Sequence, residues 1–288
     1  MQLYSINTGK FKLDGGAMFG VVPKSIWNKL NPADENNLCT WALRCLLVIE
    51  GDRKILIDTG MGNKQDEKFF SHYQPHDTVD LATALAQYQI QPEEITDVLL
   101  THLHFDHVGG AVNKMNGELV LAFPNATYWV SEPHWNLALN PNKRERASFL
   151  TENILPLQTS GKLKLITIPP YKSDTSLQEI HFSASISCFV VNGHTQGMLL
   201  PKIQTDKGVI VYLADLLPSI GHIPIPYVMG YDMQPLLTLD EKTLFLNEAL
   251  KNNYTLFFEH DPINECCKLQ QTEKGIRAGA ILKLAELS

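Results

Sequence analysis

Short apolar runs bounded by turn residues recur along the chain and predict buried strands. Two of them, 42–49 and 53–57, are separated by Gly51-Asp52, which predicts a hairpin with a tight turn. Further apolar runs end near residues 100, 191, 214 and 259. Each of these runs leads into a segment that contains His or Asp, so the ends of the predicted strands are the places to look for chemistry.

Apolar residues at helical spacing predict helices over 79–89 and 238–252. The second stretch opens with Thr238-x-x-Glu241, the pattern of a capping box, which predicts that this helix begins at Thr238. A last helix is expected over 271–287. Strands and helices that alternate in this order predict an α/β fold, a four-layer αββα sandwich.

Metal-ligand side chains are concentrated after the apolar run that ends at residue 100. The sequence there reads THLHFDHVGG and places His102, His104, Asp106 and His107 within six residues. Imidazole and carboxylate are usual ligands of zinc and similar metals, and a turn after a buried strand lets them converge without helical spacing. A histidine-rich surface loop would leave the strand before, the glycines after and the further ligands downstream as coincidences. The sequence therefore predicts a metal site.

Further ligands are expected where the other three runs end. His194, Asp215 and His260 follow the runs that end at 191, 214 and 259. In layered α/β folds the ends of neighbouring strands share one edge, so these side chains are expected to converge. Taken singly, an Asp after a strand is most often a cap or turn residue. The signal comes from the combination of the three residues at the three strand ends. The predicted ligand set is His102, His104, Asp106, His107, His194, Asp215 and His260.

These motifs resemble the metallo-β-lactamase superfamily. The resemblance rests on His102-x-His104-x-Asp106-His107, Gly193-His194, Asp215, His260 and also Asp58-Thr59-Gly60, and it extends from about residue 40 to residue 262. Within the superfamily the chain looks like the dinuclear hydrolases, because the true β-lactamases carry Cys where this chain has Asp215. The resemblance implies the αββα metallo-β-lactamase fold.

Two other segments, 14–24 and 223–232, look more narrowly like the quorum-quenching N-acyl homoserine lactone lactonases and the related methyl parathion hydrolases. The lactonase run Gly-His-Thr-Pro-Gly-His appears here as Gly193-His194-Thr195-Gln196-Gly197-Met198, which keeps the ligand His and both glycines. The expected activity is the opening of lactones or the cleavage of related esters, N-acyl homoserine lactones first. The alternatives are a phosphotriesterase or arylesterase of the same fold and, in a different class, a di-iron redox protein. The redox alternative needs a flavin domain, for which this chain has no room.

Two divalent metal ions are the expected cofactors. Zinc is expected, and manganese, iron and cobalt are compatible with the same ligands. One ion is assigned to His102, His104 and His194, and the other to Asp106, His107 and His260. Asp215 is expected to bridge the two ions together with a shared hydroxide. Two ions lower the pKa of bound water and hold the attacking and leaving oxygens of a hydrolysis.

Several residues are expected around the metals. Asp58 is expected to orient a ligand His through its second ring nitrogen, the alternative being a turn-forming Asp before Gly60. The stretch 14–37 is rich in Gly, Pro, Asn and Asp yet keeps large apolar side chains. It is expected either to pack on its own domain or to form a lid or a homodimer arm near the pocket. The candidate pocket residues are Met18, Phe19, Ile223 and Tyr231.

A donor to the developing oxyanion is also expected. Lactonases of this resemblance commonly carry Tyr three residues after the bridging Asp, and this position is Pro218 here. His222 is the candidate replacement and Tyr231 the second choice, whereas the alternative for His222 is a structural His that caps a turn. Asp106 is counted with His222 among the catalytic residues, because it is expected to hold the second metal.

Length and charge agree with a single enzyme domain over residues 1–288. A chain of 288 residues can bury a large core in one unit. Its 31 acidic and 24 basic residues give a net charge of −7, which disfavours a nucleic-acid partner. The apolar runs are too short to cross a membrane and the N-terminus has no signal-like segment, so a cytoplasmic protein without a membrane partner is expected. The five cysteines contain no Cys-x-x-Cys pair and are expected to be reduced and mostly buried.

Overall fold

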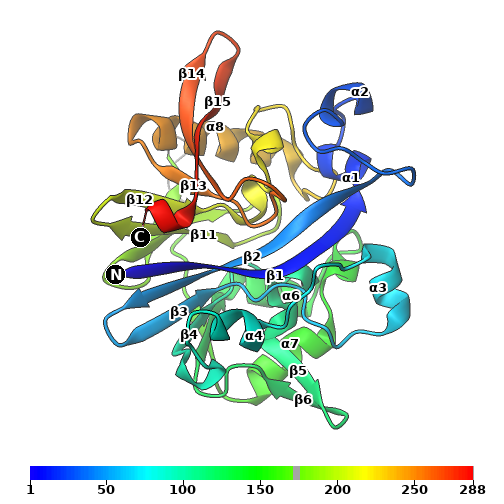
Figure 1. The fold of residues 1–288 in the computed structure, drawn as a ribbon, viewed down its shortest axis with the longest axis vertical. Coiled ribbons are helices and arrows are strands. Elements are labelled where there is room, and N and C mark those ends of the chain that lie inside the picture. Colours follow the sequence, from blue (N-terminus) through cyan, green and yellow to red (C-terminus); the bar gives the residue numbers. More distant parts are fainter. Residues whose placement is uncertain (171–175, 288) are drawn as a thin grey trace. The chain divides into compact units, whose positions relative to one another are not determined.

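The computed structural model describes residues 1–170 and 176–287 (Figure 1). Contacts among these residues divide the chain into two compact units. Unit 1 contains residues 1–10 and 43–168, and unit 2 contains residues 11–42 and the described residues from 169 to 287. The long strands β1 (Gln2–Asp14) and β2 (Leu38–Glu50) each contribute residues to both units.

Among the described residues of unit 1, strands form a mixed sheet in the order β1-β2-β3-β4-β7-β8. β2 and β3 pair antiparallel, with Leu46 opposite Ile57, so the predicted hairpin is confirmed. β3, β4, β7 and β8 are parallel neighbours in that order. Parallel strands buried on both faces are continuously apolar, which explains why the runs before the ligands lack alternation. The bounds are β3 (Arg53–Ile57), β4 (Asp97–Leu99), β7 (Thr127–Ser131) and β8 (Leu163–Ile166).

The helices of unit 1 pack on this sheet through one continuous core. Leu56, Val98 and Tyr128 from the strands share this core with Leu85 and Trp135 from the helices. The predicted helix over 79–89 is confirmed in place as the shorter α4. The bounds are α3 (Glu67–Tyr73), α4 (Leu81–Ala86), α5 (Phe105–Val108), α6 (Glu132–Leu139) and α7 (Thr151–Thr159), with a small hairpin of β5 (Val112–Met115) and β6 (Glu118–Leu121). Short 3₁₀ turns are η1 (Pro92–Glu94), η2 (Gly109–Ala111) and η3 (Arg146–Ser148).

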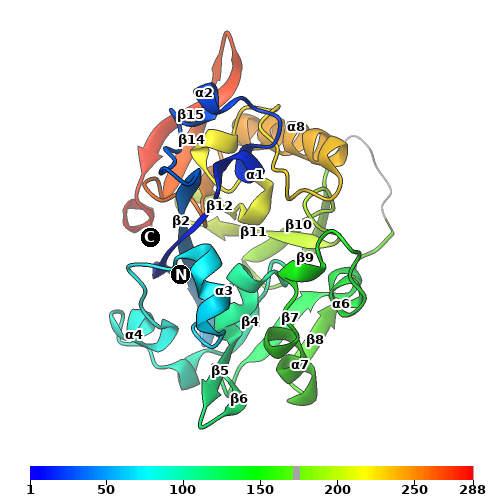
Figure 2. The same ribbon diagram turned by 90° about the vertical axis from the view of Figure 1, so that its right-hand side faces the viewer.

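The described part of unit 2 contains a second sheet in the order β15-β14-β13-β12-β11-β10-β9. Only β12 and β13 are parallel in it, because α8 (Pro235–Lys251) connects them. α8 packs against this sheet (Figure 2), and the ring centroids of Phe245 and Phe189 lie 6.1 Å apart. The bounds are β9 (Gln178–His181), β10 (Ile186–Val191), β11 (Met198–Thr205), β12 (Gly208–Tyr212), β13 (Thr255–Phe257), β14 (Cys266–Thr272) and β15 (Gly275–Leu282), with 3₁₀ turns η4 (Ala214–Leu216), η5 (Ile220–His222) and η6 (Leu284–Glu286).

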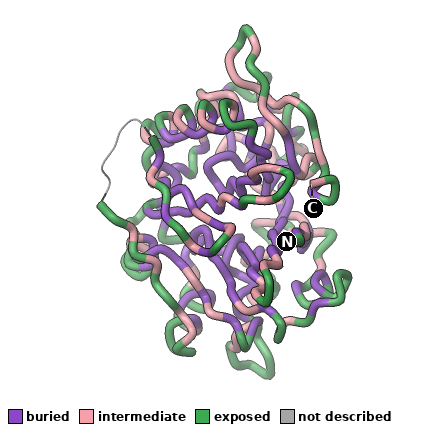
Figure 3. Tube along the Cα trace, turned by 90° about the vertical axis from the view of Figure 1, so that its left-hand side faces the viewer, coloured by how far each residue is buried: buried purple, intermediate pink, exposed green. Residues whose placement is uncertain are grey.

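One predicted helix and one predicted helix start are wrong. Residues 271–287 do not form one helix: residues 271–282 complete the β14–β15 hairpin, whose tip is largely exposed (Figure 3), and η6 follows. The chain reverses at Gly275, which has a φ of +90°, a conformation that favours glycine and ends regular structure. α8 begins at Pro235 rather than at Thr238, because proline suits the first position of a helix. The carboxylate of Glu241 therefore does not cap this helix.

The stretch 14–37 packs within unit 2 as two short helices, α1 (Gly15–Phe19) and α2 (Lys24–Trp27). Asp14 caps α1 by accepting the N–H of Ala17 at 2.8 Å, and the Phe19 and Trp27 rings stack at 5.5 Å. These contacts hold the segment in its own unit, and its role as a lid or dimer arm stays a prediction. All five cysteines are buried. In the part of the chain that the structure describes, no helix combines the length and the apolar character needed to cross a membrane.

Candidate metal centre

The predicted ligands of unit 1 lie on a buried loop that leaves β4 and continues into α5. The loop is held by backbone hydrogen bonds, including Thr59 N–H to the His107 carbonyl at 2.7 Å. Gly109 has no space for a side chain, because a Cβ there would come within 1.9 Å of the Met61 carbonyl oxygen. The two glycines after His107 are therefore required by the close approach of segments 59–62 and 107–110.

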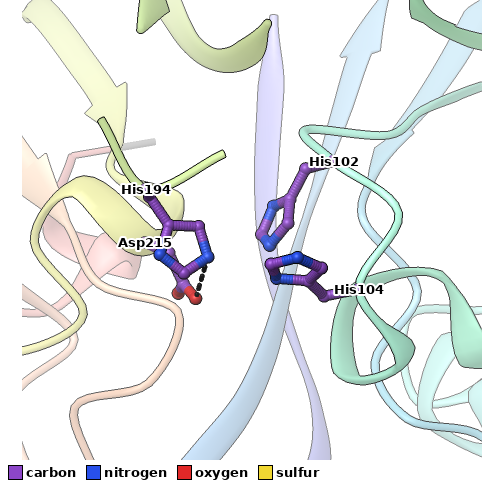
Figure 4. Close-up of side chains that lie close together, drawn as sticks. All are labelled: His102, His104, His194 and Asp215. Carbon is purple, nitrogen blue, oxygen red and sulfur yellow. Dashed lines mark ion pairs between the residues drawn. The ribbon is translucent and has the colours of Figure 1, made fainter. Parts of the chain in front are cut away.

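The imidazole rings of this loop converge. The His102 ring centroid lies 3.9 Å from that of His107 and 4.6 Å from that of His104, and the latter pair is drawn in Figure 4. Asp106 adds a carboxylate, with its Oδ2 3.9 Å from the Nε2 of His107. All four side chains are buried. The predicted local cluster is confirmed as a spatial cluster within unit 1.

Asp58 organises two of these rings. Its fully buried carboxylate accepts the N–H of Thr101 at 2.8 Å, the hydroxyl of Thr101 at 2.6 Å and the Nδ1–H of His107 at 3.1 Å. Because the Thr101 hydroxyl donates to Asp58, its oxygen accepts the Nδ1–H of His102 at 3.1 Å. Both rings therefore carry their proton on Nδ1 and present the Nε2 lone pair. Asp58 thus contacts His107, while its predicted role in orienting a metal ligand stays a prediction; Thr101 was missed.

The backbone at Asp58 is unusual. Its φ of +56° lies in the left-handed region, which Asp and Asn tolerate better than other residues with a side chain. This conformation turns the chain after β3 and directs the carboxylate toward Thr101.

His104 has a different environment. The buried carboxylate of Glu145 lies 3.7 Å from its Nε2, and Asn142 donates to the same carboxylate at 2.5 Å. The next residue, Leu103, donates its N–H to the Nε2 of the buried His134 at 2.8 Å. Both residues were missed: Glu145 follows no apolar run, and His134 lies in α6 soon after β7, as the ligands do after their strands.

The predicted ligands of unit 2 come from three strand ends. His194 lies in the loop after β10, Asp215 lies in η4 after β12, and His260 follows β13. β12 and β13 are parallel neighbours, and Leu213 N–H donates to the Phe257 carbonyl at 3.1 Å. Asp215 and His260 therefore leave the same edge of one sheet, as the sequence predicted. Ala214, just before Asp215, has a φ of +41°, which is strained for a residue with a Cβ.

Asp215 faces both histidines of this unit. Its Oδ2 lies 3.2 Å from the Nε2 of His194 (Figure 4), and its Oδ1 lies 3.2 Å from the Nε2 of His260. The Nδ1 of His260 is 2.8 Å from the Ala42 carbonyl, which can only accept, so this nitrogen carries a proton. The Nδ1 of His194 is 2.9 Å from Oδ1 of the buried Asp232. Asp232 was missed, although it is the only acid in the apolar segment 220–233.

The donor set in unit 2 fits a cation on each side of Asp215. Two imidazoles with Nδ1–H present Nε2 lone pairs toward the two carboxylate oxygens, and lone pairs repel unless positive charge lies between them. A divalent metal that binds both an imidazole nitrogen and a carboxylate oxygen supplies this charge. The hydrogen bonds to Asp232 and Ala42 are the partners that metal-binding histidines ordinarily have.

The prediction that His222 donates to an oxyanion is wrong. Its Nε2–H donates to the Met18 carbonyl at 2.8 Å, so Nδ1 accepts the hydroxyl of Ser219 at 2.9 Å, and neither nitrogen is left for a substrate. The ring stacks on Phe19 with centroids 4.4 Å apart. His222 is thus the structural His of the alternative interpretation.

Three of the four predicted pocket residues are buried, and the fourth is exposed. Met18, Phe19 and Ile223 are each at most 2% exposed, so their side chains offer no surface to a ligand and this prediction is wrong for them. Tyr231 is 37% exposed and stays a prediction.

We expect His222 to make folding stability depend on acidity. Burial lowers the pKa of its imidazole from 6.5 to about 3, so the unfolded chain binds a proton between these pH values and the folded protein does not. Stability is then lost as pH falls from about 6.5 toward 3. In urea unfolding at several pH values, His222→Gln should show a shallower acid slope, by up to ~1.4 kcal/mol per pH unit. His181→Gln, at an exposed site, is the control, and equal slopes in wild type and His222→Gln would contradict the assignment.

Comparison with known proteins agrees with this geometry. Residues 44–173 match the model of the metallo-beta-lactamase superfamily. An N-acyl homoserine lactonase of Bacillus cereus is 25% identical over 273 residues, which cover 90% of this chain and 93% of that protein. A probable metal-dependent hydrolase from Staphylococcus aureus has a solved structure with a TM-score of 0.86 and 27% identity, covering 98% of this chain and 96% of the other.

A second solved structure shares the fold at lower identity. It is AidC, a dizinc quorum-quenching lactonase with a bound product, with a TM-score of 0.77 and 21% identity over 98% of this chain and 95% of the other. The expected fold class is confirmed by these likenesses. Residues 44–173 therefore match a metallo-β-lactamase domain, and the chain has the fold of, and is similar to, metal-dependent hydrolases of that kind.

Proposed function

We propose that this metal-dependent hydrolase opens the lactone ring of N-acyl homoserine lactones with the help of two metal ions. The observation that carries the proposal is the position of Asp215, whose two carboxylate oxygens each lie 3.2 Å from the Nε2 of a different histidine. One carboxylate that serves two cation positions is the central element of a dinuclear site. The substrate class is supported by the name of the Bacillus cereus relative and by the product complex of the dizinc lactonase.

The proposed ligands fall into two groups that share Asp215 as a bridge. The first proposed group is His102, His104 and His194, and the second is Asp106, His107 and His260. Zinc is proposed as the native metal, because imidazole nitrogen and carboxylate oxygen in groups of three or four suit it, and manganese, iron and cobalt are the alternatives.

The residues around these ligands set the protonation and direction of each ring. When bound, two divalent ions lower the pKa of water to about 7 and polarise the carbonyl of an ester. Asp58, Asp232 and the Ala42 carbonyl each hold a hydrogen bond to the Nδ1 of a ligand histidine. Each ring is thereby prevented from flipping and keeps its Nε2 lone pair for a metal. This preorganisation favours the transition state because no reorientation is needed during the reaction.

An aromatic surface next to Asp106 suits the apolar acyl chain of such a substrate. Phe105 directly precedes this ligand, and its ring centroid lies 5.2 Å from that of Phe69 and 4.6 Å from that of Tyr73. Both of the latter residues belong to α3 and are partly buried, so part of each side chain remains exposed. Burial and, to a lesser extent, the charge of Asp106 raise the pKa of the Tyr73 hydroxyl, so this residue stays neutral near the carboxylate. Apolar chains gain binding energy by covering surface of this kind.

The experiment that tests the proposal is a substrate panel with metal-loaded protein. We expect N-hexanoyl and N-decanoyl homoserine lactone to gain one water, detected by mass spectrometry, with the lower KM for the longer chain. We expect kcat/KM for the better lactone to exceed that for an aryl ester, a thioester and a phosphotriester by about tenfold or more. Protein treated with a chelator is the control. Faster turnover of the phosphotriester, or no turnover of any lactone by protein with two bound ions, would contradict the proposed substrate.

A further inference from the structure

Two adjacent residues of α8, Glu241 and Lys242, are charged and buried, with exposed fractions of 5% and 0%. Charged side chains are rarely buried unless their hydrogen-bonding groups are satisfied. Here the partners are backbone groups of two loops in unit 2. The proposed reaction described above uses neither residue, so their burial needs a separate explanation.

Glu241 binds the loop that carries His194. One carboxylate oxygen accepts the N–H of Asn192 at 2.7 Å, and the other accepts the N–H of Gly193 at 2.9 Å. Both amides lie just before His194 and after the end of β10, where no neighbouring strand pairs with them in the described sheet. The carboxylate thus replaces sheet hydrogen bonds at the point where the chain leaves the strand.

The same loop lies tightly against the beginning of α8. Gln234 donates its N–H to the Gly193 carbonyl at 2.8 Å, and Met233 donates to the His194 carbonyl at 3.1 Å. A Cβ at Gly193 would come within 2.6 Å of the backbone nitrogen of Thr238. Glycine is therefore needed for Glu241 to reach the loop, and the position of His194 depends on the position of α8.

Lys242 binds the loop that leads to Asp232. Its ammonium donates to the carbonyls of Pro224, Ile225 and Tyr227 at 3.1, 3.2 and 2.8 Å, so all three N–H groups are used. The segment Pro224-Ile225-Pro226 has two prolines, which lack the N–H groups that would otherwise hold it to a neighbouring strand. The lysine gathers three carbonyls of a segment that has fewer backbone N–H donors of its own because of its two prolines.

We propose that Glu241 and Lys242 are positioning residues that together set the hydrogen bond between His194 and Asp232. Glu241 places the backbone of the histidine, and Lys242 places the loop that carries the aspartate. Because the two residues are consecutive in one rigid helix, the distance between the two loops is held by α8. The inference rests on the proposed function in so far as it treats His194 as a metal ligand.

The energetics of burial support a role beyond packing. Burial raises the pKa of the Glu241 carboxyl and lowers the pKa of the Lys242 ammonium, each to about 7, so both charges are held against a desolvation penalty. Apolar side chains of similar volume would fill this space without that penalty, and such replacements are often neutral or stabilising in proteins. The charged residues are the ones that can hold two loops by their backbone groups.

The test compares Glu241→Gln and Lys242→Met with control variants at exposed charged positions of the same helix, Asp240→Asn and Lys251→Met. Metal affinity is measured by competition with a chelator. In metal-free protein, the Nδ1–H signal of His194 is followed by NMR, and hydrogen exchange is measured at the amides of Asn192 and Gly193. We expect each test variant to lose about 10- to 100-fold in affinity for one of the two ions and to shift or broaden the His194 signal. Glu241→Gln should also speed exchange at the two amides, and the controls should stay at wild-type values.

A conservative variant separates positioning from folding. Lys242→Arg keeps the charge and several N–H donors, so we expect it to restore most of the metal affinity that Lys242→Met loses. Should Lys242→Met fail to fold, Glu241→Gln and Lys242→Arg decide the question by the same measurements. Lower unfolding free energy together with wild-type metal affinity and an unchanged His194 signal would overturn the inference. These measurements involve no lactone, so wild-type protein that binds two ions but opens no lactone would refute the proposed substrate and leave this inference standing.

Discussion

Asp215→Ala is expected to weaken the binding of both metal ions together and to lower kcat/KM for a lactone by at least about a thousandfold, or ~4 kcal/mol of transition-state stabilisation. The reason is that each oxygen of this carboxylate lies 3.2 Å from a different histidine nitrogen, so one substitution removes a ligand from both proposed sites. Elemental analysis of the purified variant gives the metal content, and steady-state kinetics give the activity.

Two further variants make this test specific. Asp206→Ala removes an exposed carboxylate from the turn between β11 and β12 and should keep about two ions per chain. Asp215→Asn keeps the shape and one oxygen but loses the charge, so it should retain more metal than Asp215→Ala and less than wild type. If Asp215→Ala loses one ion but binds the other with wild-type affinity, Asp215 does not bridge the two metal ions.

Asp58→Asn is expected to reduce metal affinity by about 10- to 100-fold, with a similar loss in kcat/KM. Asn accepts the φ of +56° at this position, so the backbone should keep its turn. The carboxylate, however, accepts three hydrogen bonds from Thr101 and His107. An amide NH₂ in place of one oxygen would face an N–H or O–H donor, and the orientation of His107 and, through Thr101, of His102 would be lost.

The matched control is Asp97→Asn, a second buried carboxylate of unit 1. Asp97 accepts hydrogen bonds from Arg53, Thr96 and Trp129 and has no contact with a proposed ligand in these interactions. The variant Asp97→Asn should lower the free energy of unfolding without changing metal affinity. Equal metal affinity in Asp58→Asn and wild type would refute the orienting role, and an equal loss in both variants would show that general destabilisation is the cause.

Part of the proposed metal centre followed from the sequence because the relevant signals are local. The proposed ligands His102 to His107 lie in one loop and the helix that follows it, and His194, Asp215 and His260 each come soon after an apolar run that forms a buried strand. Buried strands are apolar because both faces are covered, and their ends share an edge because neighbouring strands are in register. The orienting contact of Asp58 followed from its place after β3 in the same way.

The helix boundaries show where local patterns fail. Residues 271–287 have apolar positions that suit either a helix or a hairpin, and pairing between Gln270 and Arg277 across the turn at Gly275 decides for strands. Thr238 and Glu241 have the spacing of a capping box, yet Glu241 is drawn to the amides of Asn192 and Gly193, which lie nearly fifty residues earlier.

The chain by itself thus determined the class of fold and which His and Asp residues follow the strand ends, while the tertiary structure decided which groups bind those side chains. His260 is hydrogen-bonded to the Ala42 carbonyl, 218 residues away in the sequence, and His222 to the Met18 carbonyl, 204 residues away. His194 is hydrogen-bonded to the Asp232 carboxylate, 38 residues away. Hydrogen bonds between residues so far apart in the chain have no periodicity and no fixed spacing. They arise only once separate loops pack together, because a buried polar group must find a partner among whatever groups folding brings within reach.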